Sequence, residues 1–238
     1  MKPTAVVLAA GAGKRLGELG RRHSKAMLPL AGKPLIEWIV ERLVAADIGR
    51  VVVVAHASDK ELASYFARQS SSVTIVLQAE RRGIADALRL ALPALLTNEP
   101  CLACACDSIF AAEDLAGVCS LGQQFAGAAV VGVLDMGVEA TAARSAVEVE
   151  DGRVLAIVEK PAPGATTSSL VSLPLYWLPA EFRSHLENRP LQGEHYVSTA
   201  LSEFIEVGGT VLSYRVRYRL EITMAADVAE VERALRRS

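Results

Sequence analysis

The sequence predicts an α/β fold in which a mostly parallel central sheet lies between two layers of helices. Two observations support this prediction: short apolar runs alternate with amphipathic stretches, and the apolar runs are hydrophobic throughout. Alternation of this kind is typical of right-handed strand–helix–strand units. Strands that are apolar on both faces are covered by helices on both sides. We expect the 238 residues to form a single domain, residues 1–238.

The first half of the chain carries the clearest alternation. Helix 33–46 shows apolar residues at helical spacing, and Pro34 suits its first turn, whereas Pro93 should bend or end the helix over 84–96. Strands are expected at residues 4–10, 51–55, 73–77, 102–106 and 128–134, and helices at 33–46, 59–69, 84–96 and 112–119.

The pattern changes after residue 145. Asp151-Gly152 predicts a hairpin turn between strands 146–150 and 154–158. The segment 161–169 is rich in Pro, Gly, Ser and Thr and predicts a surface loop. Extended runs are expected at 171–178 and 210–217, and helices at 198–206 and 225–236. This half therefore predicts a small region of mixed strands.

Composition excludes some classes of protein. Hydrophobic residues make up 51%, charged residues 22%, and the formal net charge is −2, so a general nucleic-acid binder is not expected. No apolar stretch is long enough to span a membrane and no targeting segment is visible, which favours a cytoplasmic protein. A homo-oligomer remains open. Cys101, Cys104 and Cys106 crowd into one run, but its apolar neighbours favour a buried strand over a metal cluster.

A glycine-containing turn directly follows the first expected strand, in the segment LAAGAGKRL at residues 8–16. Glycines at the carboxyl end of a strand let backbone N–H groups approach phosphates. A Walker A loop would need Gly in place of Leu8 and Ser or Thr in place of Arg15. A dinucleotide fingerprint would need Gly in place of Leu16, so an NAD(P)-type oxidoreductase is disfavoured.

The following residues resemble the sugar-1-phosphate nucleotidyltransferase family, whose domains share the MobA-like NTP transferase fold. Arg15 ends the glycine-rich loop, Lys25 precedes a Leu-x-Pro element, and Gly-Lys-Pro-Leu follows at residues 32–35, all in the family's order. The resemblance continues through QAERRGIADA at 78–87, CDSIF at 106–110, EKP at 159–161 and the segment 220–228.

The resemblance implies a Rossmann-like three-layer sandwich with a small mixed-strand acceptor-binding region. It also implies an enzyme that joins an NTP to a sugar 1-phosphate, giving a sugar nucleotide and pyrophosphate, with Mg²⁺ as cofactor. Carried over by motif, it implies catalytic roles for Arg15 and Lys25; nucleotide binding by Leu8, Ala9, Ala10, Gly11, Ala12, Gly13, Lys14, Gln78, Gly83 and Ile84; acceptor binding by Glu159, Lys160 and Tyr176; and metal binding by Asp107 and Glu221.

The implied chemistry suits these residue types. A phosphate oxygen attacks the α-phosphorus of an NTP, and because both partners are anionic, catalysis consists of positioning and charge neutralisation. Arg15 would neutralise the departing pyrophosphate, and Lys25 would hold the α-phosphate. Magnesium needs carboxylate oxygens and leaves other positions open for phosphate and water.

Several positions depart from the family pattern. Cys106 replaces a Gly and Glu221 replaces the commoner Asp, which keeps a non-catalytic nucleotide-binding or regulatory protein open. Ser145-Ala146 and Pro174 replace glycines of the acceptor pocket, so a hexose is not assured. A cytidylyl- or guanylyltransferase acting on a non-hexose phosphorylated acceptor is the enzymatic alternative. The Gln78 amide favours UTP or dTTP but can also meet adenine.

For several of these residues a purely structural role, without binding or catalysis, also remains open. Asp107 could cap the following helix, Glu221 could be a solvated strand-end charge, and Lys160 could be an exposed loop lysine. Gln78 could be a polar strand-end residue, and Asp86 is expected to face solvent on its helix.

Overall fold

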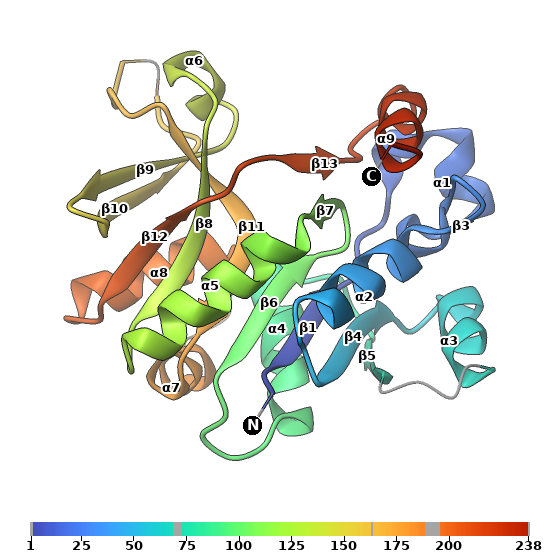
Figure 1. Cartoon of the computed structure of the whole chain (residues 1–238), viewed down its shortest axis with the longest axis horizontal. Coiled ribbons are helices and arrows are strands. Elements are labelled where there is room, and N and C mark those ends of the chain that lie inside the picture. Colours follow the sequence, from blue (N-terminus) through green and yellow to red (C-terminus); the bar gives the residue numbers. More distant parts are fainter. Residues whose placement is uncertain (1, 69–72, 163, 189–195, 238) are drawn as a thin grey trace.

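A computed structural model describes residues 2–68, 73–162, 164–188 and 196–237. Within these residues a nine-stranded sheet runs through the centre of the molecule (Figure 1). Its order is β5 (Val73–Gln78), β4 (Arg50–His56), β1 (Thr4–Leu8), β6 (Cys101–Ala105), β11 (Leu170–Leu178), β8 (Ala129–Asp135), β12 (Val211–Arg215), β10 (Arg153–Glu159) and β9 (Ser145–Glu150).

Helices cover both faces of the sheet, which confirms the three-layer α/β class. Successive residues of β1 point to opposite faces, so Val7 packs in one hydrophobic core and Val6 in the other. The first core includes α2 (Leu35–Ala45), α3 (Lys60–Ala67), α5 (Ala112–Gln124) and α9 (Asp227–Leu235), and the second includes α4 (Ile84–Ala91), α7 (Ala180–Asn188) and α8 (Val197–Glu206).

The sheet is mixed, and its parallel part lies at one end. β5, β4, β1 and β6 are all parallel, so their carboxyl ends meet at one edge. β11 then enters antiparallel between β6 and β8. β12 runs parallel to β8, and the β9–β10 hairpin around Asp151-Gly152 closes the other end as the sequence predicts.

Most expected elements are present, with shifted ends. Helix α2 begins at Leu35 because Pro34 is extended and belongs to β3 (Lys33–Pro34), which pairs with β2 (Pro29–Leu30). Pro93 ends α4 early, in the short 3₁₀ turn Leu92–Ala94. Position 69 of the expected helix 59–69 lies outside the described residues. The sequence pattern missed α7 and the short elements η1 (Lys14–Leu16), α1 (Glu18–Arg22), η2 (Lys25–Met27) and α6 (Val138–Thr141).

A small ribbon brings the end of the chain beside the parallel edge of the sheet. β7 (Ser108–Phe110) pairs antiparallel with β13 (Arg219–Glu221), and the Ile222 N–H donates to the Asp107 carbonyl at 2.9 Å. The position of Asp107 before β7 excludes a role as the cap of α5, which begins only at Ala112. The ribbon therefore sets Glu221 close to Asp107 in the fold.

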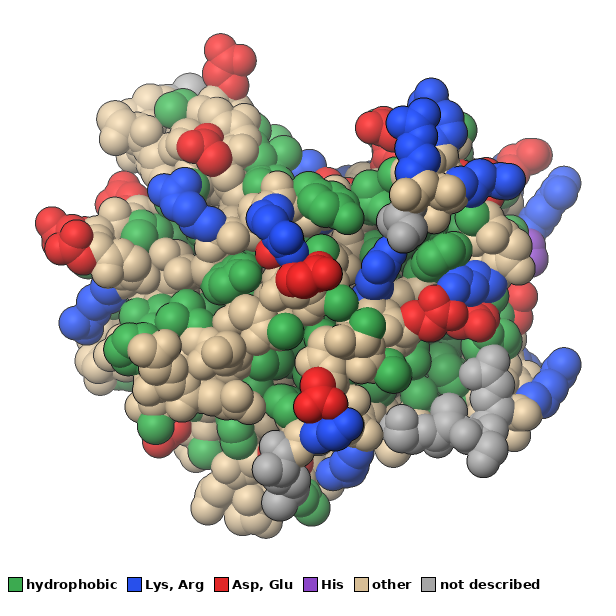
Figure 2. Space-filling model, viewed as in Figure 1, with side chains coloured by type: hydrophobic (Ala, Val, Ile, Leu, Met, Phe, Trp, Pro, Cys, Tyr) green, Lys and Arg blue, Asp and Glu red, His purple; other side chains and the backbone are tan. Residues whose placement is uncertain are grey.

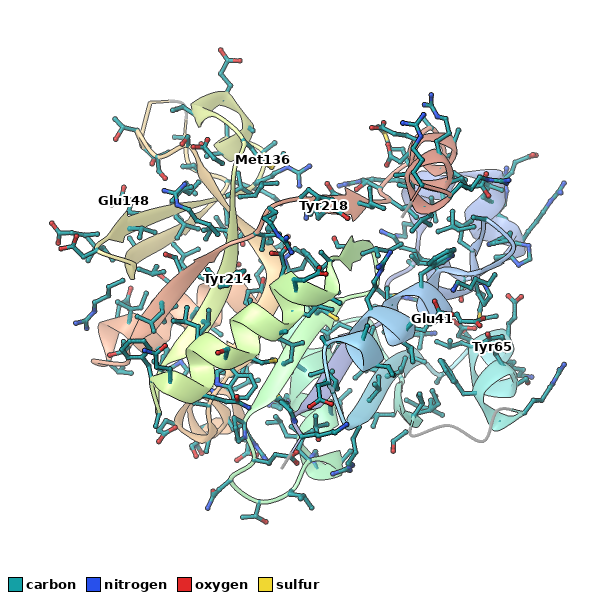
Figure 3. The ribbon with its side chains drawn as sticks, viewed as in Figure 1. Glu41, Tyr65, Met136, Glu148, Tyr214 and Tyr218 are labelled. Atoms are coloured by element: carbon teal, nitrogen blue, oxygen red, sulfur yellow. The ribbon has the colours of Figure 1, made fainter. Side chains whose placement is uncertain are left out.

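Two glycines let α5 lie close to the mixed half of the sheet. A Cβ at Gly117 would overlap the ring of Tyr214 on β12, and a Cβ at Gly122 would overlap the indole of Trp177 on β11. Figure 3 shows Tyr214 beside α5. The two aromatic rings therefore occupy the space that larger side chains on the helix would need.

The visible surface carries charges of both signs. In Figure 2 the Lys and Arg side chains are interspersed with Asp and Glu, and the surface is hollowed between the parts around α6 and α9. No helix among the described residues is both long enough and apolar enough to span a membrane.

Candidate functional site

The glycine-rich loop leaves the carboxyl end of β1 at the parallel edge of the sheet. Backbone hydrogen bonds tie its start to both neighbouring strands: Ala9 N–H donates to Val54, and Cys106 N–H donates to Leu8. Gly13 has a φ of 59°, a left-handed conformation that favours glycine. Buried Leu16 anchors the following turn, so that Lys14 and Arg15 are held at the exposed end of the loop.

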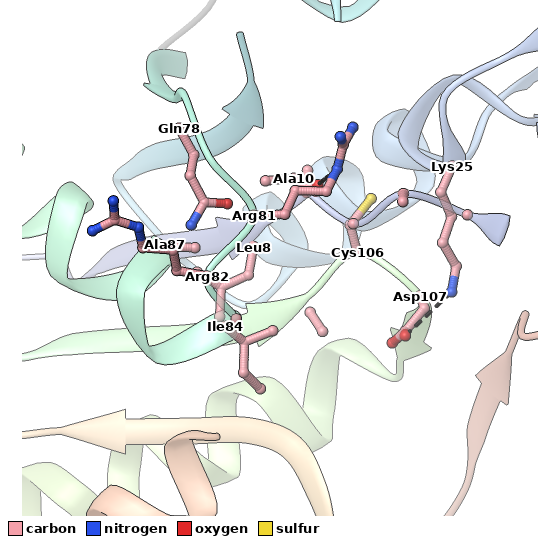
Figure 4. Close-up of a pocket in the computed structure, with 16 residues that line it drawn as sticks. Leu8, Ala10, Lys25, Gln78, Arg81, Arg82, Ile84, Ala87, Cys106 and Asp107 are labelled. Atoms are coloured by element: carbon pink, nitrogen blue, oxygen red, sulfur yellow. Dashed lines mark hydrogen bonds and ion pairs between the residues drawn. The ribbon is translucent and has the colours of Figure 1, made fainter. Parts of the chain in front are cut away.

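The loop forms one wall of a pocket of about 610 Å³. Figure 4 shows Gln78 at one end of this pocket and the Lys25–Asp107 pair at the other. The lining residues named from the sequence are Leu8, Ala9, Ala10, Gly11, Ala12, Gly13, Lys25, Gln78, Gly83, Ile84 and Asp107. The structure thus brings together residues from the carboxyl ends of β1, β5 and β6.

A second hollow of about 630 Å³ continues from the first, because Gly11 to Gly13, Lys25, Ile84 and Asp107 line both. It contains the remaining residues named from the sequence: Lys14, Arg15, Glu159, Lys160, Tyr176 and Glu221. We call the two hollows together the groove. Every residue expected to bind nucleotide, acceptor or metal therefore lies along one continuous groove.

Lys25 and Asp107 form an ion pair where the two hollows meet. The Lys25 Nζ lies 3.2 Å from Asp107 Oδ2, and the side chains are 16% and 34% exposed. The Ser108 hydroxyl donates to Asp107 Oδ1 at 3.1 Å. The Asp107 carboxylate thus has a fixed orientation and still faces the groove, as a ligand for a cation would.

Glu221, a metal ligand in the expectation drawn from the sequence resemblance, is paired with two arginines. Arg144 donates to both of its oxygens, at 3.3 and 3.0 Å, and Arg219 donates to Oε2 at 2.7 Å. Burial lowers the pKa of the Arg219 guanidinium, and the Glu221 carboxylate opposes this by stabilising its positive charge. Two guanidinium groups therefore already neutralise this carboxylate.

The Asp107 carboxylate has the chemistry of a Mg²⁺ ligand. Among the described residues no group of three His, Cys, Asp or Glu side chains could hold a metal ion. Mg²⁺ is commonly bound through one or two carboxylates together with substrate phosphates and water. The Asp107 carboxylate, which lines the groove beside the glycine-rich loop, supplies one such carboxylate.

One part of the second hollow is built around Glu159. Its Oε1 accepts hydrogen bonds from Ser145 Oγ, at 2.9 Å, and from Ser198 Oγ, which hold the carboxylate against the wall. Exposed Lys160 donates from Nζ to the Tyr196 hydroxyl at 3.4 Å. Tyr176 is only 3% exposed, and burial raises the pKa of its hydroxyl. Tyr176 therefore shapes the wall of the groove more than it offers a free hydroxyl.

Asp86 is buried, which corrects the expectation that it faces solvent. It lies on the inner face of α4, is 5% exposed, and accepts a hydrogen bond from Gln78 Nε2 at 2.8 Å. Gln78 is itself 2% exposed although it lines the pocket. The sequence pattern did not predict the burial of Asp86, because its neighbours on α4 are apolar and no partner for the carboxylate is apparent from them.

Residues 5–204 match the family model described as the MobA-like NTP transferase domain. The chain belongs to this family. The UTP–glucose-1-phosphate uridylyltransferase AglF of Haloferax volcanii is 30% identical to it over 237 residues, which cover 97% of the chain and 96% of the relative. The bifunctional protein GlmU of Pelotomaculum thermopropionicum is 29% identical over 250 residues. That match covers 100% of the chain but 53% of the relative, so the chain spans about half the length of this relative.

Solved structures share the fold of this NTP transferase domain. The UTP-bound UGPase from Acinetobacter baumannii superimposes with a TM-score of 0.87 over 99% of the chain and 93% of that structure, at 22% identity. At that identity the likeness establishes the fold only.

Sequence reasoning missed several groove residues of the NTP transferase domain. Arg81 donates from Nε to the Ala10 carbonyl at 2.9 Å and so joins the segment after β5 to the glycine-rich loop. Arg144, Ser198 and Arg219 act on Glu221 and Glu159 from separate parts of the chain. Arg219 lies next to the closing segment 220–228, but none of these residues stands in a motif that reveals its partner.

The cysteine interpretation is confirmed. All four cysteines are free and buried, with Cys104 and Cys106 in one core and Cys101 in the other. Burial raises the pKa of Cys101, Cys104 and Cys119 to about 12, so these thiols are protonated and behave as small apolar groups.

Proposed function

We propose that this NTP transferase domain joins a nucleoside triphosphate to a sugar 1-phosphate and releases pyrophosphate. The observation that carries the proposal is the continuous groove, in which a glycine-rich loop, two cationic side chains and an open carboxylate lie between a nucleotide pocket and an acceptor hollow. AglF, which is named as a UTP–glucose-1-phosphate uridylyltransferase and matches the chain nearly end to end, supports the same reaction class.

The residues at the junction of the hollows suit attack on the α-phosphorus. Lys25 lies where the α-phosphate of a nucleotide in the first pocket would meet an acceptor in the second. Arg15, at the exposed end of the loop, offers a planar set of donors for the departing pyrophosphate. Bound at Asp107, Mg²⁺ would offset the negative charge of the phosphates.

The acceptor is proposed to bind through two kinds of contact. Lys160 supplies a positive charge for the acceptor phosphate, and Glu159 supplies carboxylate oxygens for hydroxyl groups. Ser145 and Pro174 line this hollow and fill space that glycine would leave open, so we expect the acceptor ring to be smaller than a common hexose or different in shape. For the nucleotide we propose UTP or dTTP, which the amide of Gln78 can pair with.

The test is a matrix of the five common NTPs against phosphorylated acceptors, with pyrophosphate release as the readout. We expect release with one pairing of a pyrimidine NTP and a sugar 1-phosphate. Arg15→Ala and Lys25→Ala should each reduce turnover about 10²–10³-fold, because each removes a preorganised charge from the transition state. Arg21→Ala, on an exposed arginine that forms an ion pair with Glu18 and does not line the groove, is the matched control.

Two results would count against the proposal. Thermal protection by NTP and magnesium without pyrophosphate release from any pairing would indicate a nucleotide-binding or regulatory protein. Near wild-type turnover in both Arg15→Ala and Lys25→Ala would show that neither side chain takes part in catalysis.

A further inference from the structure

The buried carboxylate of Asp86 is hydrogen-bonded to the amide of Gln78, which lines the first pocket. Gln78, the last residue of β5, donates from Nε2 to Asp86 Oδ2 at 2.8 Å. The other oxygen of Asp86, Oδ1, lies 3.5 Å from the Arg89 guanidinium. Both oxygens of Asp86 therefore face donors, and Asp86 lies in the first turn of α4, where the helix dipole stabilises negative charge.

This hydrogen bond fixes the orientation of the Gln78 amide, that is, the positions of its oxygen and its nitrogen. A primary amide can usually exchange the places of its oxygen and nitrogen, because each end finds partners of either kind. A carboxylate only accepts hydrogen bonds, so an exchanged amide would set Oε1 of Gln78 against Oδ2 of Asp86 in a buried site. Figure 4 shows the resulting order, with the amide oxygen on the side of Ala10.

The order of donor and acceptor on an amide matters for a nucleobase. Uracil and thymine present an N–H next to a carbonyl, whereas cytosine presents a ring acceptor next to an amino group. A freely turning amide pairs with either edge. An amide held in one orientation meets one edge with two hydrogen bonds and sets the other edge donor against donor and acceptor against acceptor.

We infer that Asp86 is a positioning residue that turns Gln78 into a directional reader of the base, selecting a uracil- or thymine-type edge over a cytosine-type edge. Oε1 of Gln78 accepts from the ring N–H, and the second N–H of Nε2 donates to the neighbouring carbonyl. Asp86 acts through Gln78 and does not touch the nucleotide. The inference rests on the proposed function for its nucleotide, but it concerns binding and does not need turnover.

The test compares the affinities for UTP and CTP, measured by calorimetry with magnesium present. Wild type should bind UTP roughly 10- to 100-fold more tightly than CTP, because the mismatched edge leaves buried polar groups unpaired. In Asp86→Asn the new amide can accept or donate, so both orientations of Gln78 are satisfied and the ratio should fall to about threefold or less. Asp86→Ser, whose hydroxyl also donates or accepts, is a second variant in case the first does not fold.

Asp114 offers a matched control. It is a fully buried carboxylate in the first turn of α5, as Asp86 is in α4, and it accepts from Arg217 Nε at 3.1 Å. It does not line the groove. Asp114→Asn should therefore cost stability without changing the UTP-to-CTP ratio.

The outcomes separate the inference from the proposed function. An unchanged ratio in folded Asp86→Asn or Asp86→Ser, or a wild type that binds both nucleotides equally, would overturn the inference alone. A ratio that collapses as expected in a protein that never releases pyrophosphate would support the inference and overturn the proposed transfer reaction. A wild type that binds no nucleotide would overturn both.

Discussion

The carboxylates that line the groove are paired with donors, and this determines which cationic side chains of the groove have no acidic partner. Asp107 pairs with Lys25, Glu221 pairs with two arginines, and Glu159 accepts from two serines. Among the described residues, Lys14 and Arg15 have no such acidic partner. The loop end thus carries the positive charge that a polyanion meets first.

At this scale the two expected metal carboxylates should behave differently. Asp107→Asn should abolish most activity, because the variant loses the carboxylate that faces the groove beside Lys25 and that we propose as the magnesium ligand. Glu221→Gln should leave the magnesium concentration for half-maximal activity unchanged but lower the free energy of unfolding by about 1–3 kcal/mol, since buried Arg219 loses its charged acceptor. Pyrophosphate release over a magnesium titration, together with urea unfolding, measures both effects.

Other patterns would contradict this division. Full activity of the wild type in excess EDTA would show that the reaction does not require a divalent metal ion. A raised magnesium requirement in Glu221→Gln would show that Arg144 and Arg219 release the carboxylate to a metal ion when substrates bind.

The positions of the motif residues in the groove were predictable from the sequence, because phosphate binding requires particular side chains at the ends of strands. Arg15, Lys25 and Asp107 follow directly from such motifs, and all three line the groove. Asp86 was not predictable, because a carboxylate among apolar residues of a helix looks like a solvated group until its partner, eight residues earlier, is known.

At the scale of elements, the packing of α5 depends on a glycine, which has no side chain. Gly122 is buried against the indole of Trp177, and this contact allows the helix to pack on β11. In an ordinary helix a glycine costs about 1 kcal/mol relative to alanine. Here the missing side chain provides space for the ring.

Gly122→Ala should therefore destabilise the protein although alanine is the better helix former. Overpacking a filled site costs about 1–3 kcal/mol, which exceeds the gain in helix propensity. Ser120→Ala, at an exposed position of the same helix, should change stability by less than about 0.5 kcal/mol. Urea unfolding of the two variants decides the point, and a more stable Gly122→Ala would show that the indole can move aside.

Element types were predicted better than their ends. Periodicity located α2 and α4, and the Asp151-Gly152 turn located the β9–β10 hairpin, to within a few residues at most ends. The β7–β13 ribbon could not be predicted, because three-residue strands more than 100 residues apart have no local signal. The missed helix α7 follows Pro179 and carries polar residues on most of its surface.

At the scale of the whole molecule, the groove crosses from the parallel part of the sheet to the mixed part. The first pocket is formed by the segments that follow β1, β5 and β6, whereas most of the second hollow comes from residues after 142. Substitutions in the second part should therefore act on the acceptor without affecting the nucleotide.

Lys160→Ala tests that separation. It should raise the KM for the phosphorylated acceptor roughly 10- to 100-fold, the usual effect of losing a charged hydrogen bond, and leave the KM for the NTP within about twofold. Lys2→Ala, an exposed lysine paired with Asp47 at the opposite end of β1, is the control. Equal increases in both KM values would assign Lys160 to the triphosphate or to the fold.

The position of β11 next to β6, out of chain order, has a consequence for synthesis on the ribosome. β6 is complete at Ala105, but the strand that covers its free edge begins only at Leu170. At 5–20 residues per second, the nascent chain keeps this apolar edge unpaired for roughly 3 to 13 seconds. An uncovered edge of this kind can pair with other chains, so premature termination between these two points should yield aggregating fragments.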